Sequence, residues 1–310
     1  MKKRRPYPIL HRGAAAVFCL IGVLLIAGCA SRSGAAAGRL QPFSLMPENT
    51  VLYVQFPAVP NEGAVRAFTD ALAPQLAPAD IRKVLKRVDT VYAGFDASGN
   101  LSSAVTGSFP SFALGAVFSK KNGWRKIPAA SGGGAGAYYA RPDIPLQFAF
   151  PSSSLAFIAA DVSAMFAGGT EPDIGAAIAI DGRAEAVSSS YGFTHAAADD
   201  IRFYIKDPIF VMRRLRQSGF VFDFPLAAVS GTLSFAGLDP ETGSPAYALT
   251  ALIELSDSRA LRPALAMLGI AVRIGGKNFD FEAASADSVR ISGAVFNIDT
   301  IVSLFTNQPS

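Results

Sequence analysis

The chain has 310 residues, half of them apolar, with 28 Lys and Arg against 24 Asp and Glu. This is enough apolar material for the core of one large domain or two smaller ones. Five of the basic residues lie in the first 12 positions and no acidic residue precedes Glu48. The positive charge therefore belongs to the N-terminus, and we expect no nucleic-acid partner.

The N-terminal basic segment leads into an apolar run from Ala14 to Ala27. A basic segment, a short apolar run and small residues before a cleavage site are typical of a secretory signal peptide. The run is shorter than the roughly 20 residues that a transmembrane helix needs. Its ending, Leu-Ile-Ala-Gly-Cys at residues 25–29, resembles the lipobox of bacterial lipoproteins. That resemblance implies cleavage after Gly28 and a diacylglycerol on Cys29; the alternatives are an ordinary signal peptide or a single transmembrane helix.

Cleavage changes the chemistry that remains. It removes five basic and no acidic residues, so the mature chain is close to neutral. Cys19 is lost with the signal and Cys29 carries lipid, which leaves no thiol for a disulfide or a nucleophile. Two acyl chains are enough for stable membrane anchoring.

The first part of the mature chain is predicted to be a tether followed by a strand. Residues 30–38 are Ser, Arg, Gly and Ala, with no large apolar side chain to bury. Residues 51–56 are rich in β-branched and aromatic side chains between Pro47 and Pro57, which predicts a buried strand.

Two amphipathic helices are expected next. Apolar residues recur at helical spacing over residues 65–72 and again over residues 81–88, where cations fill the remaining surface. The apolar positions are Val65, Phe68, Leu72, Ile81, Val84, Leu85 and Val88, and the cations are Arg82, Lys83, Lys86 and Arg87.

Two hairpins follow in the first half. Residues 90–95 and 101–109 flank an Asp-Ala-Ser-Gly-Asn turn, and residues 146–150 and 155–159 flank Pro151 and three serines. A short helix is predicted over residues 112–121 and another after Asp161. Trp124, among four cations, is either an interfacial anchor or a half-buried loop residue.

The same order of elements recurs in the second half. A strand at residues 201–205 precedes a second basic amphipathic helix, strands at 229–238 and 247–255 flank a turn, and a helix at 258–268 precedes a hairpin at 279–296. The basic helix carries Phe210, Met212, Leu215, Arg213 and Arg214.

We therefore predict an α+β fold of two duplicated β-α-β-β-α-β-β-α halves, with a mainly antiparallel sheet flanked by amphipathic helices. An α+β protein without duplication would also alternate helices and hairpins. The expected division is a cleaved signal peptide at residues 1–28, a lipidated flexible tether at 29–45, a first repeat at 46–169, an inter-repeat segment at 170–200 and a second repeat at 201–307. Within the inter-repeat segment, residues 174–180 are predicted to be a strand and residues 188–198 a loop.

No residue pattern indicates catalysis. His195 is the only histidine of the mature chain and lies in a predicted loop, and no Gly-x-Ser-x-Gly motif occurs. The two Asp-rich turns lack calcium-loop spacing, and a zinc site would need His or Cys ligands that are absent. We expect no enzyme activity, no metal and no cofactor.

The amphipathic helices either lie on the membrane or pack on their own sheet. Lipid anchoring favours the membrane, because a tethered domain meets it at high effective concentration. On the first interpretation the protein contacts membrane lipids through Cys29 and the helices; on the second it is a periplasmic module for an unidentified protein partner.

A lipobox, an opening segment Met-Pro-Glu-Asn-Thr-Val-Leu-Tyr-Val at residues 46–54, paired α+β halves and several amphipathic helices together resemble treponemal outer-membrane lipoproteins. These proteins lie concealed on the periplasmic face of the outer membrane. The resemblance implies a two-state protein that inserts helices into the inner leaflet, perturbs the bilayer and has a cavity able to bind or transport lipid. It brings no catalytic residues.

Overall fold

The computed structural model describes residues 42–72, 87–111, 114–115, 118–129, 137–142, 144–167, 182–208, 225–275 and 279–306. The signal peptide, the start of the tether and both basic helical segments predicted above lie outside these residues, except for Arg87 and Val88.

The first half of the chain contains most of the strands. Its elements are η1 (Pro42–Leu45), β1 (Thr50–Pro57), α2 (Glu62–Leu72), β2 (Val88–Asp96), β3 (Leu101–Gly107), η2 (Lys120–Asn122), β4 (Arg125–Pro128), β5 (Ala137–Arg141), β6 (Ile144–Ser152), β7 (Leu155–Ala159) and α5 (Ser163–Ala167).

The second half begins with two short helices. Its elements are α6 (Gly182–Ser189), α7 (Tyr191–Thr194), β8 (Ile201–Ile205), β9 (Leu226–Leu238), β10 (Pro245–Leu255), η3 (Ser258–Ala260), α9 (Leu261–Gly275), β11 (Asp280–Ala283), β12 (Ser288–Asn297) and α10 (Ile298–Thr306).

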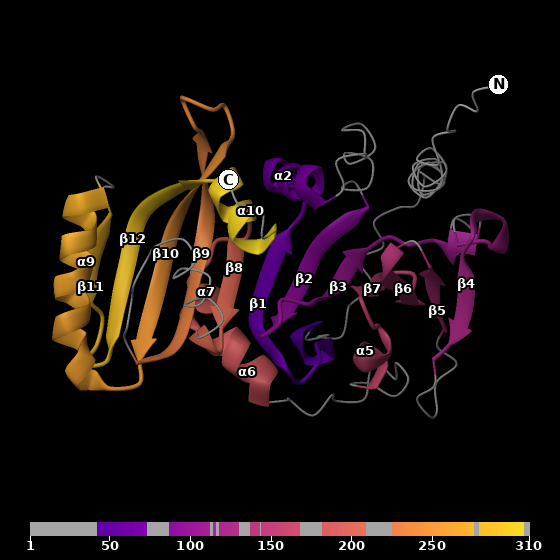
Figure 1. Cartoon of the computed structure of the whole chain (residues 1–310), viewed down its shortest axis with the longest axis horizontal. Helices are drawn as coiled ribbons and strands as arrows, with labels where there is room; N and C mark the ends of the chain where they lie inside the picture. The colour runs from indigo at the N-terminus through magenta and orange to yellow at the C-terminus, as the bar shows by residue number, and fades with distance from the viewer. Residues whose placement is uncertain are drawn as a thin grey trace, which may run out of the picture.

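All twelve described strands form one sheet in the order β11-β12-β10-β9-β8-β1-β2-β3-β7-β6-β5-β4 (Figure 1). Every adjacent pair is antiparallel. The prediction of a mainly antiparallel sheet with helices is confirmed. Outward from the central β1–β8 pair, one side of the sheet runs β1, β2, β3, β7 and β6, and the other runs β8, β9, β10, β12 and β11. On the first side, β5 and β4 continue the sheet beyond β6.

The predicted hairpins are present, and acidic side chains shape their turns. Asp96 Oδ1 accepts hydrogen bonds from the backbone N–H groups of Ser98 and Asn100 at 2.9 and 2.8 Å. Partial burial opposes ionisation of Asp96, but these hydrogen bonds outweigh it and lower its pKa. Asp239 likewise accepts the amides two and three residues further on, which lowers its pKa. Both turns therefore use carboxylates as backbone acceptors.

The ordered fold starts earlier than the tether boundary predicted at residue 45. Phe43 and Leu45 of η1 are buried. The Phe43 ring meets those of Tyr53, Tyr92 and Phe193 edge-on, with centroids 5.3–5.6 Å apart. The boundary was misplaced because two large apolar side chains follow the small-residue stretch, and the sheet buries them.

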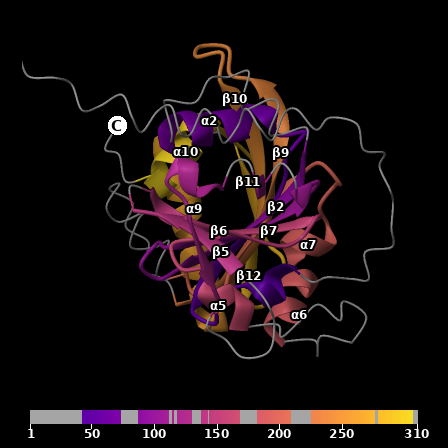
Figure 2. The same cartoon turned by 90° about the vertical axis from the view of Figure 1, so that its right-hand side faces the viewer.

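The helices divide between the two faces of the sheet: α6 and α7 lie on one side, and α9 and α10 on the other (Figure 2). Residues 188–198, predicted to be a loop, contain the end of α6 and all of α7. Gly192 of α7 lies so close to β9 that a Cβ on it would come within 2.3 Å of the Gly231 carbonyl oxygen. A glycine is therefore needed for this close approach. The segment 174–180 lies outside the described residues.

Trp124 is neither an interfacial anchor nor a half-buried loop residue. Only 1% of it is exposed. Its ring lies 4.8 Å from that of Phe118 and 5.6 Å from that of Phe148, and the Arg141 guanidinium stacks over it at 5.5 Å. The nearby cations suggested an interface, but Phe118 from the preceding turn and Phe148 from β6 enclose the ring.

Because Trp124 is the only tryptophan of the chain, its fluorescence reports on this core. We expect native emission that is blue-shifted from that of the denatured chain, protected from acrylamide, and unchanged when lipid vesicles are added. Quenching of the native emission by brominated lipids would contradict the buried position.

Candidate membrane-facing surface

Helix α2 lies across one end of the sheet and is anchored at its start by a buried asparagine. The Asn61 side-chain amide donates to the Pro57 carbonyl at 2.9 Å and to the Asp199 carbonyl at 2.8 Å. Its own carbonyl accepts the N–H of Val65 at 3.0 Å. Asn61 thus joins the end of β1, the start of α2 and the loop before β8.

The underside of α2 packs on a buried tyrosine. Ala64 is fully buried in a cluster with Phe56 and Tyr247. Burial raises the pKa of Tyr247 to about 12, and a hydrogen bond with the Ala64 backbone partly opposes this shift. The tyrosine therefore holds the first turns of α2 against β10.

Helix α10 lies beside α2 and is linked to the β9–β10 turn. Ile298 is buried in the same cluster as Ala64. The Ser244 hydroxyl donates to Asp299 at 2.8 Å, and the Asn297 amide donates to the Thr242 hydroxyl at 3.1 Å. The two helices and the turn consequently contact one another where β1, β9 and β12 finish.

Large apolar side chains are exposed at this end. Val59, Phe235, Leu238 and Val295 are 63%, 57%, 66% and 51% exposed. All four lie near the ends of β1, β9 and β12, which run in the same direction and finish beside α2 and α10 (Figure 1). Phe235, opposite Tyr247, lies on the sheet face that α2 and α10 cover, whereas Val295, opposite Ala248, lies on the other face. We call these four residues the apolar rim. Met267, also exposed, lies apart from it on α9.

The charges around the apolar rim are mixed in sign. Glu62 and Arg66 on α2 and Glu241 on the β9–β10 turn are exposed, and Asp239 on the same turn is partly exposed. The described part of this surface is therefore apolar without being basic.

The structure gives only part of the predicted membrane-contacting set. Val65 is half-buried between two core clusters, and Arg87 is partly exposed. Val88 was expected at the end of a helix, but it is the first residue of β2 and is buried. The side chains of Phe68 and Leu72 on α2 lie outside the described residues, as do Ile81, Arg82, Lys83, Val84, Leu85, Lys86, Phe210, Met212, Arg213, Arg214 and Leu215.

Helical periodicity did not identify the apolar rim because its residues lie on strands and in a loop. Phe235 and Leu238 looked like ordinary core positions of a predicted strand. The sequence feature that could have indicated their exposure is the polar turn at residues 239–243, which directly follows Leu238. A strand next to such a turn can extend beyond its neighbours, where no helix of the described residues covers it.

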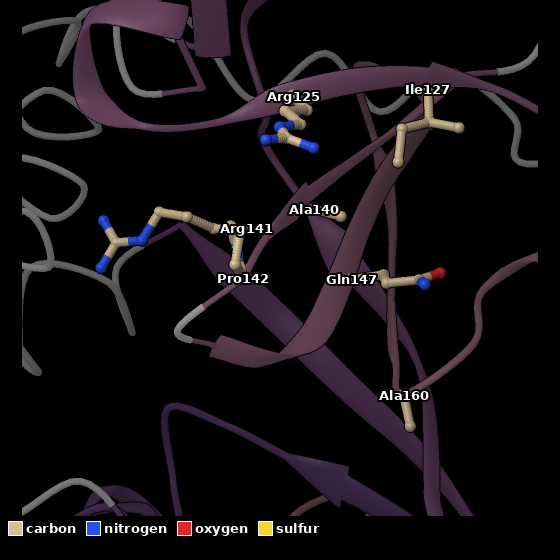
Figure 3. A pocket seen from close by; sticks show the side chains of 7 residues that line it. All are labelled: Arg125, Ile127, Ala140, Arg141, Pro142, Gln147 and Ala160. Atoms are coloured by element: carbon tan, nitrogen blue, oxygen red, sulfur yellow. The ribbon is translucent and has the colours of Figure 1, made fainter.

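A second surface feature is an open hollow over β4, β5 and β6, with a volume of about 320 Å³. Figure 3 shows Arg125, Ile127 and Ala140 at the hollow, with the Arg141 guanidinium directed away from them. The Gln147 side-chain oxygen already accepts the N–H of Val162 at 3.1 Å. This volume is near the lower end of small-molecule sites, and the hollow is too small and open to enclose a two-chain lipid.

The described residues contain no group of three or more His, Cys, Asp or Glu side chains placed to hold a metal ion. His195 stacks on Tyr191, with ring centroids 4.5 Å apart, and its Nδ1 lies 2.8 Å from the Thr194 hydroxyl. Among all the described residues, no helix combines the length and apolar character needed to cross a bilayer.

Comparison with known proteins gives a family and a fold. Residues 37–280 match the family model described as "TP0453: Outer membrane-associated lipoprotein TP0453". Three crystal forms of TP0453, a treponemal lipoprotein, resemble the chain at 18% identity. Crystal form I has a TM-score of 0.58, and the match covers 88% of this chain and 99% of the TP0453 chain. For form III the TM-score is 0.59 and the coverages are 87% and 99%. For form IV the TM-score is 0.57 and the coverages are 88% and 100%. No curated protein sequence matches the chain.

The Tyr247 contact predicts an alkaline loss of stability. A folded-state pKa near 12, above the unfolded value of 10.0, means that the unfolded chain ionises first, so stability present below pH 10 falls between pH 10 and 12. Tyr247→Phe should cost about 1 kcal/mol at pH 8 through the lost hydrogen bond, yet lose less than the native chain on going to pH 11. Urea unfolding at both pH values measures this. An equal alkaline loss in both proteins would contradict it.

Proposed function

The chain belongs to the TP0453 family of outer membrane-associated lipoproteins, and we propose that it is a non-enzymatic protein acting at the inner leaflet of the outer membrane. Acyl chains on Cys29 hold it there, and the apolar rim makes the contact of the folded domain with lipid. The exposure of Phe235 and Leu238 is the observation that carries this proposal.

The apolar rim suits a bilayer because its residues are large, exposed and gathered at one end. Single exposed apolar residues are normal on proteins, but a cluster of them marks an interaction site. Four of the five large apolar side chains exposed in the described part of the chain belong to the rim. Inserting the side of the β9–β10 hairpin would bury Phe235 and Leu238 while Asp239 and Glu241 stay at the headgroups.

The tether is long enough for this orientation. Twelve residues lie between Cys29 and Pro42, and the connection spans at most about 45 Å when extended. A strand of 13 residues such as β9 is about 43 Å long. The lipid anchor therefore reaches either end of the sheet.

Mixed charge at the apolar rim means that apolar burial, not anionic attraction, supplies its affinity. Zwitterionic vesicles should then suffice for the rim. The basic helical segments at residues 81–88 and 210–216 are proposed as additional contacts that favour anionic lipid. Binding or transport of a lipid is a further proposal, for which the open hollow offers at most a headgroup site.

The repeated strand succession supports an internal duplication as the origin of the fold. β1, β2, β3, β7 and β6 correspond in order to β8, β9, β10, β12 and β11. Each half also ends in a short helix, α5 or α10, after its last strand. On this proposal β4 and β5 are an addition to the first half.

The alternative is a periplasmic module that recruits a protein partner during envelope assembly. The open edges of the sheet favour it, because unpaired strand edges are ready sites for another chain. Stoichiometric capture of a partner, with no lipid contact at the apolar rim, would support this function instead.

Replacing the lipobox cysteine tests the anchor. Cys29→Ser should abolish incorporation of a clickable palmitate analogue and move the protein from the detergent to the aqueous phase in a phase-partition experiment. Cys19→Ser should keep both the label and the detergent partition, because Cys19 lies in the signal segment. Retained label on Cys29→Ser would show that the acyl chain is elsewhere.

The contact of the apolar rim is tested without the anchor, in full-length mature protein carrying Cys29→Ser. Replacing both Phe235 and Leu238 by Ala should weaken flotation with vesicles about 10-fold or more, since burying a Phe or Leu side chain contributes about 1.5–3 kcal/mol. Met267→Ala is the matched control, exposed but outside the rim, and should bind as before. Equal flotation of all three proteins would remove the rim from the contact.

A further inference from the structure

The sheet ends at two short strands whose outer edges pair with no other described strand. β4, with the sequence Arg-Lys-Ile-Pro, lies at one end and β11, with the sequence Asp-Phe-Glu-Ala, at the other (Figure 1). An open edge presents unpaired backbone N–H and C=O groups, so it can accept a strand from a second chain.

The two edges carry opposite charge. Lys120, Lys121, Arg125 and Lys126 are exposed on and just before β4. On and just after β11 the exposed charged side chains are Asp280, Glu282 and Asp287. Two copies meeting β4 to β4, or β11 to β11, would bring like charges together, whereas β4 to β11 joins opposite charges.

Strand direction is compatible with the same contact. Twelve strands that are antiparallel throughout leave the first and last running in opposite directions. A second copy added head to tail therefore continues the antiparallel alternation. We propose that β4 of one copy pairs with β11 of the next, so that copies of this chain join their sheets end to end.

The register of this contact follows from a continuous row across the sheet. Residues directly opposite in adjacent strands share a face, and the described pairings connect Ile127 on β4 to Asp280 on β11 without a break. The row runs Ile127, Tyr138, Ala149, Phe157, Ala104, Tyr92, Gln55, Arg202, Thr232, Thr250, Ser292, Asp280.

Continuing that row into the next copy places Ile127 opposite Asp280 and Arg125 opposite Glu282 on the same face. Glu282 is bonded to Arg290 at 3.0 Å, but its side chain is 64% exposed. A carboxylate has lone pairs for more than one guanidinium. Glu282 can thus accept Arg125 from the incoming copy without releasing Arg290.

The contact is built to be weak in solution. Each edge offers four residues, and Pro128 lacks an N–H, as is common on edges protected against indiscriminate pairing. Anchoring in one membrane raises the effective concentration of the copies. Because the two sides of the contact differ, assembly is head to tail and gives chains or closed rings of copies, not two-fold dimers.

Disulfide trapping of the lipidated protein in vesicles tests this directly, because acylated Cys29 leaves no other thiol in the mature chain. Ile127→Cys combined with Asp280→Cys should give a ladder of dimers, trimers and longer products on oxidation. Adding Arg125→Glu should reduce the products beyond dimer about fivefold or more, because Glu would face Glu282. Lys206→Glu, the same charge change on an exposed residue after β8, should leave the ladder unchanged.

A mixture of two single-cysteine proteins gives the sharper result. One carries Asp280→Cys and the other carries Ile127→Cys, so only β4 of one protein against β11 of the other brings two thiols together. Mixed, they should give a cross-linked heterodimer, and neither should cross-link alone. Absence of cross-links, or dimers alone from the double-cysteine protein, would overturn the proposal. Flotation of the same proteins is independent of the outcome and separates this contact from membrane binding.

Discussion

The pairing of β1 with β8 is the contact on which the rest of this structure depends. Four residue pairs, from Leu52–Ile205 to Gln55–Arg202, join strands that lie about 150 residues apart. Leu52 and Ile205 are buried together, and Tyr53 is buried on the opposite face. This pairing merges two halves into one sheet, so neither half has a free inner edge, and among the described strands the outer edges are those of β4 and β11.

The described helices cover the two faces of that sheet unevenly. The parts of the sheet that they leave exposed can contact a membrane or another chain. η1, α6 and α7 bury one face near the centre, while α2, α9 and α10 cover the other. Buried polar groups of Asn61 and Tyr247 fix α2 on the sheet near the end of β1. The β9–β10 hairpin projects beside this helix. An apolar side chain on that hairpin has no further helix of the described residues to pack against, so within this part of the structure it faces water or another apolar phase.

Supporting structure and exposed surface are therefore separate in this protein. Trp124, Phe118 and Phe148 form a closed aromatic cluster near β4 that stabilises the first half, whereas the apolar rim is exposed and contacts the core through Phe235, whose ring meets that of Tyr247 edge-on with centroids 5.9 Å apart. Substitutions of Leu238 consequently report on contacts outside the chain, and substitutions in the cluster report on folding. The charged side chains at the β4 and β11 edges are likewise free of the core, since they are exposed.

The sequence by itself predicted the hairpins, their turns and the antiparallel character of the sheet, and it also predicts an export signal in residues outside the described structure. These depend on local features: the apolar run before Cys29, the alternation of strands, and Asp and Gly residues that satisfy or permit turn backbone. Only the tertiary structure decided that β1 pairs with β8, that Phe43 and Trp124 are buried, that Val88 opens a strand, and that Phe235 and Leu238 stay exposed. Burial and strand pairing depend on residues far away in the chain. The periodicity of a short segment therefore does not predict which distant residues will pack against it.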